Sequence, residues 1–231
     1  MDALQQILAW DEGLFLSLNG LHSPFFDNFM WLFSSKLIWV PTALGVVYAL
    51  VKDKRKELLF ILAGIILTIV LCDQLSSSVI KPFFHRLRPS HQFGDLVHVI
   101  NGYRGGRYGF VSSHAANAFG FALFTSLIFR FIPYTIATFT WAVVNSYSRI
   151  YLGVHYPSDI FCGALLGLAC AYVAYLLLCY ITKLYKKRTS TVTLNDTPLP
   201  APDNMRRHKS LWTVISILVL SVIYISVYSV K

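Results

Sequence analysis

Long apolar runs separated by short polar segments fill most of this chain. A helix needs about 20 apolar residues to cross the hydrocarbon core of a bilayer, and several runs approach that length. The pattern therefore predicts an all-α fold, a polytopic transmembrane helical bundle of about six crossings. The expected crossing helices cover residues 29–51, 57–80, 113–130, 133–149, 157–182 and 211–230.

Polar residues and prolines mark where these helices begin and bend. The first apolar run is interrupted by the polar residues 34–36 and again by Pro41. Pro157 stands where the fifth helix is expected to begin, because proline fits the first turn of a helix. Residues 2–20 place apolar and polar positions at helical spacing, which predicts a helix that lies at the membrane interface rather than crossing it.

The composition agrees with a membrane protein, because 55% of the 231 residues are hydrophobic and only 13% are charged. A formal net charge of +9 raises nucleic acid as a partner, but most of the excess lies in loops beside the apolar runs. Membrane topology and anionic headgroups account for that placement, so no nucleic acid is expected. The four cysteines lie inside apolar segments without C-x-x-C spacing, which predicts neither a disulfide framework nor a zinc site.

Positive charge also predicts the orientation of the bundle. Segments 52–56, 130 and 183–209 are expected on one side of the membrane and carry 12 of the 20 Lys and Arg residues. The positive-inside tendency assigns that side to the cytoplasm. The loop 81–110 is too polar to lie in lipid, and it then faces outward.

Three short segments beside the apolar runs carry the candidate chemistry. They are residues 81–89 (KPFFHRLRP), 112–114 (SSH) and 148–159, in which Ser-Arg is followed by His155 and Asp159. An even number of expected crossings separates them, so all three reach the same side of the membrane. Together they offer three cations, two histidines and one carboxylate at the boundary between membrane and water.

This set of side chains suits a phosphate ester. A phosphate monoester carries nearly two negative charges and several acceptor oxygens. Arg88 and Arg149 offer planar forks that grip two oxygens each, whereas Lys81 offers a point charge. Ser112 can donate its hydroxyl, and the backbone N–H groups near Ser113 open the third crossing helix, where the helix dipole favours an anion.

The spacing of the three segments resembles the motifs of the type 2 phosphatidic acid phosphatase (PAP2) superfamily, K-x6-R-P, P-S-G-H and S-R-x5-H-x3-D, over residues 55–185. The first and third motifs match at every defining position, whereas the second has Val111 for the proline and Ser113 for the glycine. The resemblance implies a phosphate-binding set of Lys81, Arg88, Ser112, Ser113 and Arg149.

The resemblance also implies the roles of the remaining motif residues. His155 would attack phosphorus and form a phosphohistidine, and Asp159 would fix its tautomer and orientation. His114 would protonate the departing lipid alkoxide and then activate water. No acidic cluster typical of magnesium-dependent phosphoryl transfer is present in the sequence, so no metal and no cofactor are expected.

Other polar residues of the sequence are less specific. Arg86, Arg104 and Arg107 serve either as topology anchors or as contacts to the substrate's headgroup. Asp73 lies within the second expected crossing, where a carboxylate is costly, and we expect it to be structural and paired with a cation of the site. Gly163 and Gly167 form a G-x-x-x-G spacing, which predicts close helix packing within the monomer. The role of His85 stays open.

These observations predict an integral membrane lipid phosphatase that removes a phosphate or diphosphate from an amphiphilic lipid. Lipid A phosphate and undecaprenyl diphosphate are the leading substrates, followed by phosphatidylglycerophosphate and phosphatidic acid. We expect the bacterial inner membrane, with the active site on the periplasmic face, and membrane lipids as the other partners. The oligomeric state stays open. The expected organisation is an interfacial helix 1–24, a catalytic transmembrane domain 25–188, a cytoplasmic linker 189–209 and a C-terminal transmembrane helix 210–231.

Three alternatives are open at this point. A transporter or lipid-binding protein could use the same cations without cleaving the substrate, although it would need neither motif histidine. An inactive relative is suggested by Val111 and Ser113, because the Ser113 side chain could crowd the phosphate. A vanadate-dependent haloperoxidase shares the site pattern but is disfavoured by the transmembrane segments.

Overall fold

The computed structural model describes residues 3–189 and 208–230, which are helical apart from turns and one isolated bridge between Leu87 and Tyr108. The longer helices are α1 (Ala3–Asn19), α2 (Pro24–Phe33), α3 (Val40–Asp53), α4 (Leu58–Asp73), α7 (Ser113–Phe129), α8 (Ile132–Tyr151), α9 (Pro157–Thr189) and α10 (Lys209–Ser229). The short helices are η1 (Leu37–Trp39), η2 (Arg55–Glu57), η3 (Gln74–Ile80), α5 (Lys81–Phe84), α6 (Pro89–Gln92), η4 (Gly94–Leu96) and η5 (Ile100–Gly102). The predicted all-α fold is confirmed.

The predicted crossings all correspond to helices. Within residues 3–189 and 208–230, three helical stretches are long and apolar enough to cross a membrane: Arg55–Phe84, Pro157–Tyr185 and Lys209–Ser229. The first expected crossing is a bent pair, Pro24–Phe33 and Leu37–Asp53, whose halves meet at 65°. The bend lies at the polar residues between the two helices. Helix α7 is apolar but shorter, so the total of six crossings stays a prediction.

Two helical stretches extend beyond the ends expected for the crossings. The second apolar stretch continues past Ile80 to Phe84, because the π-helix η3 is followed directly by α5, with Pro82 in the first turn of α5. Proline is tolerated there, since its missing N–H group is not needed in a first turn. The fifth stretch continues beyond residue 182 to Thr189. Most of the predicted linker 189–209, residues 190–207, lies outside the described residues.

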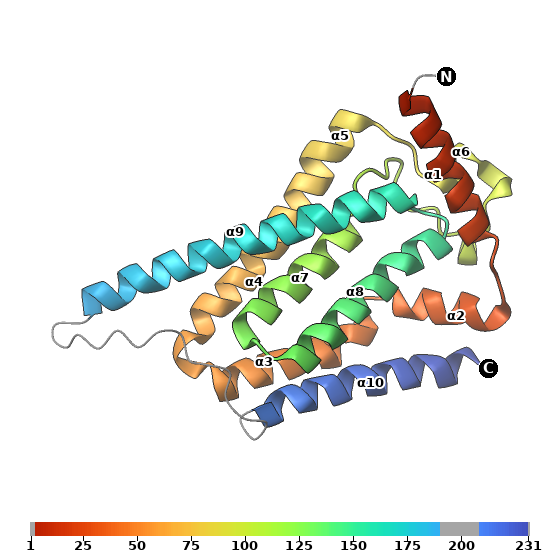
Figure 1. Ribbon diagram of the computed structural model, residues 1–231. Coiled ribbons are helices and arrows are strands. Elements are labelled where there is room, and N and C mark those ends of the chain that lie inside the picture. Colours follow the sequence, from red (N-terminus) through yellow and green to blue (C-terminus); the bar gives the residue numbers. More distant parts are fainter. Residues whose placement is uncertain (1–2, 190–207, 231) are drawn as a thin grey trace.

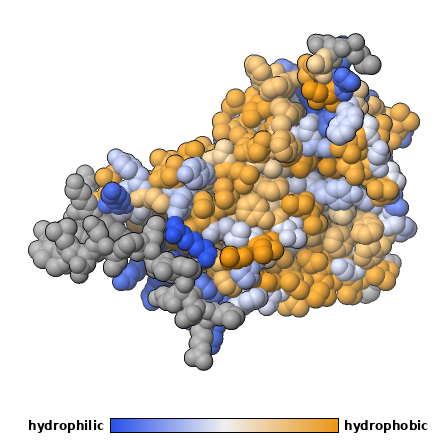
Figure 2. Space-filling model, viewed as in Figure 1, coloured by the Kyte–Doolittle hydropathy of each residue, from blue (hydrophilic) through white to orange (hydrophobic). Residues whose placement is uncertain are grey.

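The bundle brings the three motif segments to one end. In Figure 1 the loop after α5, the start of α7, the end of α8 and the start of α9 lie toward α1, while the end of α9 and the α3–α4 connection lie at the opposite end. The middle of the face in Figure 2 is mostly hydrophobic, and hydrophilic residues gather toward its two ends. Large apolar side chains such as Leu59 (79%) and Phe161 (65%) are exposed, as expected for helices that face lipid.

Helices α7 and α9 pack with their backbones almost in contact. A Cβ atom at Gly163 would lie 2.5 Å from the Ser112 carbonyl oxygen, and one at Gly167 would lie 2.1 Å from the Ala116 carbonyl oxygen. No other residue fits at such distances. The predicted packing of the G-x-x-x-G segment within the monomer is therefore confirmed.

Helix α1 is anchored to the bundle rather than only adjacent to it. Phe15 is fully buried, and its ring meets the Tyr156 ring edge to face at 5.4 Å. Asp11 is only 7% exposed. Whether α1 also lies at a membrane interface stays a prediction.

We expect Gly167→Ala to lower the thermal stability of the detergent-solubilised protein. Its methyl group would push α9 away from α7, and overpacking of this kind costs about 1–3 kcal/mol. Gly13→Ala is the matched control, because a Cβ atom there meets no atom within 4 Å and alanine favours helix by about 1 kcal/mol. Equal melting temperatures of the two variants would contradict the close packing.

Candidate active site

His155 is the buried centre of the site. It lies in the short connection between α8 and α9 and is only 1% exposed. Its Nδ1 atom is 3.2 Å from Oδ2 of Asp159, which stands in the first turn of α9. The Tyr156 backbone N–H donates to the same oxygen at 3.0 Å. The start of α9 at Pro157 thus fixes the carboxylate under the imidazole, as the sequence predicted.

The neighbours of His155 determine its tautomer. Arg88 Nη1 lies 3.2 Å from His155 Nε2. A guanidinium can only donate hydrogen bonds, so Nε2 must present its lone pair. The proton then resides on Nδ1, which donates to Asp159. The lone pair on Nε2 therefore points into the cluster of cations.

The electrostatic surroundings keep this imidazole neutral. Burial, followed by the positive charges of Arg88 and Arg149, holds the pKa of His155 well below 6.5. A neutral imidazole is the form that can attack an electrophile. His114 also contributes to the lowered pKa of His155, so the two histidines are electrostatically coupled.

A glycine-rich loop holds Arg88 in place. Arg88 donates from Nε to the Tyr108 carbonyl oxygen at 3.2 Å and from Nη1 to the Val154 carbonyl oxygen at 3.3 Å. A Cβ atom at Gly105 would lie 2.9 Å from Arg88 Nη1, and one at Gly109 would lie 2.8 Å from Asp159 Oδ2. The loop backbone therefore closes directly over the guanidinium and the carboxylate.

Ser113, which stands where the motif has glycine, binds Lys81 through its side chain. Lys81 Nζ donates to Ser113 Oγ at 2.5 Å, and Ser76 Oγ donates to the same oxygen at 2.8 Å. Ser112 is fully buried and caps α7, because its Oγ accepts from the Ala115 backbone N–H at 3.4 Å. Its hydroxyl proton stays available for a phosphate oxygen.

Arg149 lies in the last turn of α8 and is 2% exposed. Its Nη1 donates to Ser34 Oγ, and its Nη2 donates to the Tyr103 hydroxyl at 3.0 Å. Its Nε is buried and has no hydrogen-bond partner within residues 3–189 and 208–230. The arginine is thus fixed through both Nη atoms, while its Nε–H has no partner among the described residues.

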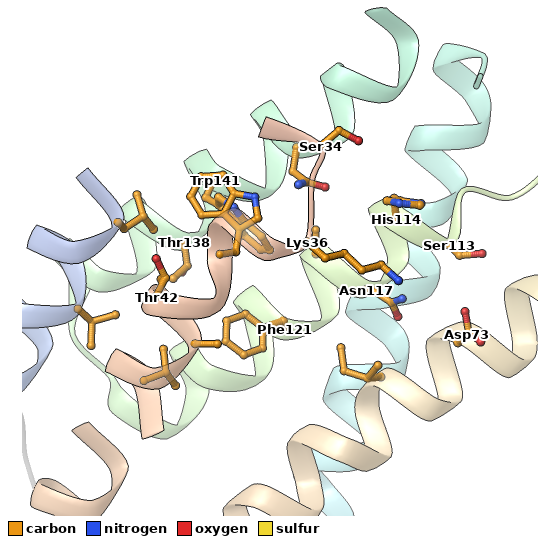
Figure 3. Close-up of a pocket in the computed structure, with 18 residues that line it drawn as sticks. Ser34, Lys36, Thr42, Asp73, Ser113, His114, Asn117, Phe121, Thr138 and Trp141 are labelled. Atoms are coloured by element: carbon orange, nitrogen blue, oxygen red, sulfur yellow. The ribbon is translucent and has the colours of Figure 1, made fainter. Parts of the chain in front are cut away.

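His114 opens onto a cavity of about 330 Å³ that runs into the bundle. Figure 3 shows His114, Ser113 and Asn117 near one end of this cavity, with Lys36 extending toward Asn117. Away from His114, Figure 3 shows Phe121, Trp141, Thr42 and Thr138 on the wall, and the lining also includes the apolar residues Trp39, Val46, Val214 and Leu218. A polar mouth and an apolar interior suit an amphiphilic molecule.

Asp73 does not pair as expected. It lies on the cavity wall, and its carboxylate takes part in none of the ion pairs between described residues. Figure 3 shows Asp73 at the same end of the cavity as Ser113, the residue that binds Lys81. Lys36 was missed by the sequence analysis, because a lone lysine in an apolar run gives no motif.

The two arginines predicted to contact the headgroup lie in the loop beside the site. Arg104 donates to the Ser90 carbonyl oxygen at 3.3 Å and to Asp95 at 3.4 Å. Arg107 is exposed beside the Tyr108 ring, with its guanidinium carbon 5.7 Å from the ring centroid. Their contact with a headgroup stays a prediction.

Arg86 points inward, which the sequence analysis did not predict. Its Nη1 donates to Asp159 Oδ1 at 3.2 Å, and its Nη2 donates to Asp11 Oδ2 at 2.7 Å. Arg86 is therefore held between two carboxylates, and whether it also acts as a topology anchor or headgroup contact stays open. One hint of the role of Asp11 is present in the sequence. It is an acidic residue on the otherwise apolar side of the amphipathic segment 2–20.

One group of described side chains has the composition of a metal site. Ligand atoms of His22, Asp27 and His98 lie within 4.8 Å of one another. Asp27 already accepts from the Tyr151 hydroxyl at 2.7 Å and is 3.1 Å from His22 Nδ1. None of the three residues belongs to a motif, so this cluster is separate from the candidate chemistry.

The comparisons with known proteins agree with this geometry. The model of the PAP2 superfamily matches residues 57–183 of this chain. A protein of Porphyromonas gingivalis named lipid A 4'-phosphatase is 45% identical over 175 residues, which cover 74% of each chain. A protein of the same name from Bacteroides thetaiotaomicron is 46% identical over 161 residues, which cover 68% of this chain and 72% of the relative.

Two solved structures are similar. The crystal structure of Aquifex aeolicus LpxE has a TM-score of 0.58 and 28% identity, and the match covers 70% of this chain and 92% of that one. The first transmembrane PAP2 type phosphatidylglycerolphosphate phosphatase from Bacillus subtilis has a TM-score of 0.54 and 21% identity, covering 84% and 90%. The second likeness concerns the fold alone.

The lowered pKa of His155 has a consequence for stability. Below pH 6.5 the unfolded chain binds a proton at this histidine and the folded chain does not, so the contribution of His155 to folding stability falls as the pH falls. The contribution of His155 to this loss is at most about 1.4 kcal/mol per pH unit. We expect the melting temperature to drop less between about pH 7.5 and about pH 5.5 in His155→Asn than in the wild type. Identical losses would contradict a buried, neutral imidazole.

Proposed function

This chain belongs to the PAP2 superfamily, and we propose from that premise that it removes a phosphate group from lipid A. The chain is an integral membrane phosphatase. Support for the substrate comes from the two relatives at 45% and 46% identity, both named for the 4'-phosphate of lipid A. The observation that carries the chemistry is His155, held between Asp159 and Arg88 with the Nε2 lone pair among the cations.

The first step transfers the phosphoryl group to the enzyme. Nε2 of His155 attacks phosphorus, the bond from phosphorus to the sugar oxygen breaks, and His114 donates a proton to the departing oxygen. Arg88, Arg149 and Lys81 stabilise the charge that builds on the equatorial oxygens, and donors of this kind are worth roughly 3–4 kcal/mol each. Asp159 stabilises the positive charge that develops on the imidazole.

The second step releases the phosphate. His114, now neutral, takes a proton from water as the water attacks phosphorus. The bond between phosphorus and Nε2 breaks, and the electron pair returns to His155. Inorganic phosphate leaves, and each histidine regains its starting protonation state.

The cavity beside His114 gives the lipid a place in this scheme. Its polar mouth lies next to the catalytic acid, and its interior is apolar. A substrate with its phosphate at the motif residues and part of its acyl region in the cavity would keep its remaining chains in the membrane. We place the site on the periplasmic face of the inner membrane, on the basis of the basic segments at the opposite end of the bundle.

The rival predictions fare differently. Membership of a phosphatase family removes the reason to prefer a transporter, and the apolar helices disfavour a haloperoxidase. Ser113 binds Lys81 instead of standing free, which weakens the argument for an inactive relative.

The substrate proposal is tested with purified protein in detergent and no ion gradient. We expect phosphate release from lipid A to exceed that from undecaprenyl diphosphate, phosphatidylglycerophosphate and phosphatidic acid. His155→Ala should abolish release while the protein still folds, whereas His208→Ala, at the start of α10, should leave it unchanged. Turnover by His155→Ala would reject the nucleophile, and preference for another lipid would reject lipid A.

Vanadate and EDTA test the phosphate site separately. Vanadate should inhibit by occupying the cations around His155, and Arg149→Gln should weaken its inhibition at least about 10-fold, since a buried charged donor is lost. EDTA should leave the rate unchanged. Indifference to vanadate, or a loss with EDTA that magnesium restores, would contradict the proposed chemistry.

A further inference from the structure

The N-terminal helix reaches the catalytic residues through one ion-paired chain. Asp11 of α1 accepts from Arg86 Nη2 at 2.7 Å, and Arg86 Nη1 donates to Asp159 Oδ1 at 3.2 Å. The other oxygen of Asp159 faces His155 Nδ1. We propose that Asp11 and Arg86 are positioning residues of the reaction, and that α1 thereby sets the orientation of the nucleophile. This inference rests on the proposed phosphohistidine mechanism.

The geometry leaves Arg86 little freedom. Its side chain is 17% exposed, between carboxylates of 9% and 0% exposure. Its guanidinium carbon lies 3.9 Å from the centroid of the Tyr156 ring, which covers one face. Because Tyr156 follows His155 directly, the ring that supports Arg86 and the nucleophile belong to the same short connection.

Asp11 also fixes the start of α9. Its Oδ1 accepts from the Ser158 backbone N–H at 2.9 Å, and its Oδ2 accepts from Ser158 Oγ at 2.5 Å. Ser158 Oγ in turn accepts from Arg86 Nη1 at 2.7 Å. Asp11 therefore caps α9 from another helix, one residue before Asp159.

The two carboxylate oxygens of Asp159 have different partners, and Arg86 contacts only one of them. Oδ2 is occupied by His155 and by the Tyr156 backbone, so the orientation of the carboxylate depends on what holds Oδ1. Arg86 is the residue that holds it. Without that contact the carboxylate can rotate, and the imidazole that it holds no longer directs Nε2 toward phosphorus. Misplacement of a reacting group by about 1 Å costs on the order of 100-fold in rate.

Asp11 and Arg86 both lie outside the defining positions of the three motifs. Asp11 lies outside the matched residues 57–183, and Arg86 lies between the defining lysine and arginine of the first motif. Neither belongs to the motif pattern. Their link to Asp159 is visible only in the folded protein.

The test measures kcat and KM of Asp11→Asn, Arg86→Gln and the double variant on lipid A, or on whichever of the four lipids the wild type hydrolyses. Asparagine can still accept from the Ser158 N–H group but cannot pair with Arg86. We expect Asp11→Asn to lower kcat by about 10-fold with little change in KM, and the double variant to be no slower than Arg86→Gln. Glu12→Gln is the matched control, because the neighbouring carboxylate accepts from Gln92 and should leave kcat unchanged.

The pH profile separates positioning from a merely structural role. Arg86→Gln removes the cation on Asp159, so the acid side of the kcat profile should move to higher pH. Arg86→Lys keeps the charge and should restore the profile of the wild type. Lower melting temperatures with unchanged kcat and unchanged pH profile would overturn the proposal, as would fully additive effects in the double variant. A wild type inactive on all four lipids would overturn the proposed function as well, whereas an active wild type with unaffected variants overturns this inference alone.

Discussion

A buried imidazole held between a carboxylate and a guanidinium is the arrangement on which the rest of this structure depends. The Arg88 contact leaves the lone pair of His155 on Nε2, and the Asp159 contact holds the proton on Nδ1. Burial strengthens both interactions, because water does not compete for the same atoms. The same burial keeps the ring neutral until a phosphate arrives with the opposite charge. The tautomer, the neutral charge and the orientation of the His155 imidazole therefore all follow from its burial between Arg88 and Asp159.

The rest of the fold serves to bring these three groups together at the end of a membrane bundle. Glycines in helix α9 and in the loop before α7 make this possible. Gly163 and Gly167 let α7 and α9 approach until the Ser112 backbone N–H donates to the Asp159 carbonyl oxygen at 3.0 Å. Gly105 and Gly109 then let the loop close over Arg88 and the carboxylate. Charged groups can be buried here because each is paired or hydrogen-bonded.

Much of the fold was predictable because its signals are local in the sequence. Apolar runs predicted the crossing helices, amphipathic spacing predicted α1, and the polar residues 34–36 marked the interruption at which α2 and α3 meet. The end of the second stretch was not predictable, since a π-helix before Pro82 has no sequence signature. Asp73 was also misjudged, because it lies on the wall of the cavity and forms no ion pair with a described residue.

The sequence by itself determined the helical membrane architecture and the motif residues, because hydrophobic length and motif spacing are properties of the chain. Only the tertiary structure decided that Arg86 turns inward, that Asp11 of a distant helix completes its pairing, and that Lys36 lies beside His114. These choices depend on which faces of separate helices meet. A linear pattern carries no information on such contacts, because a charged side chain can pair with any partner that the packing brings within reach.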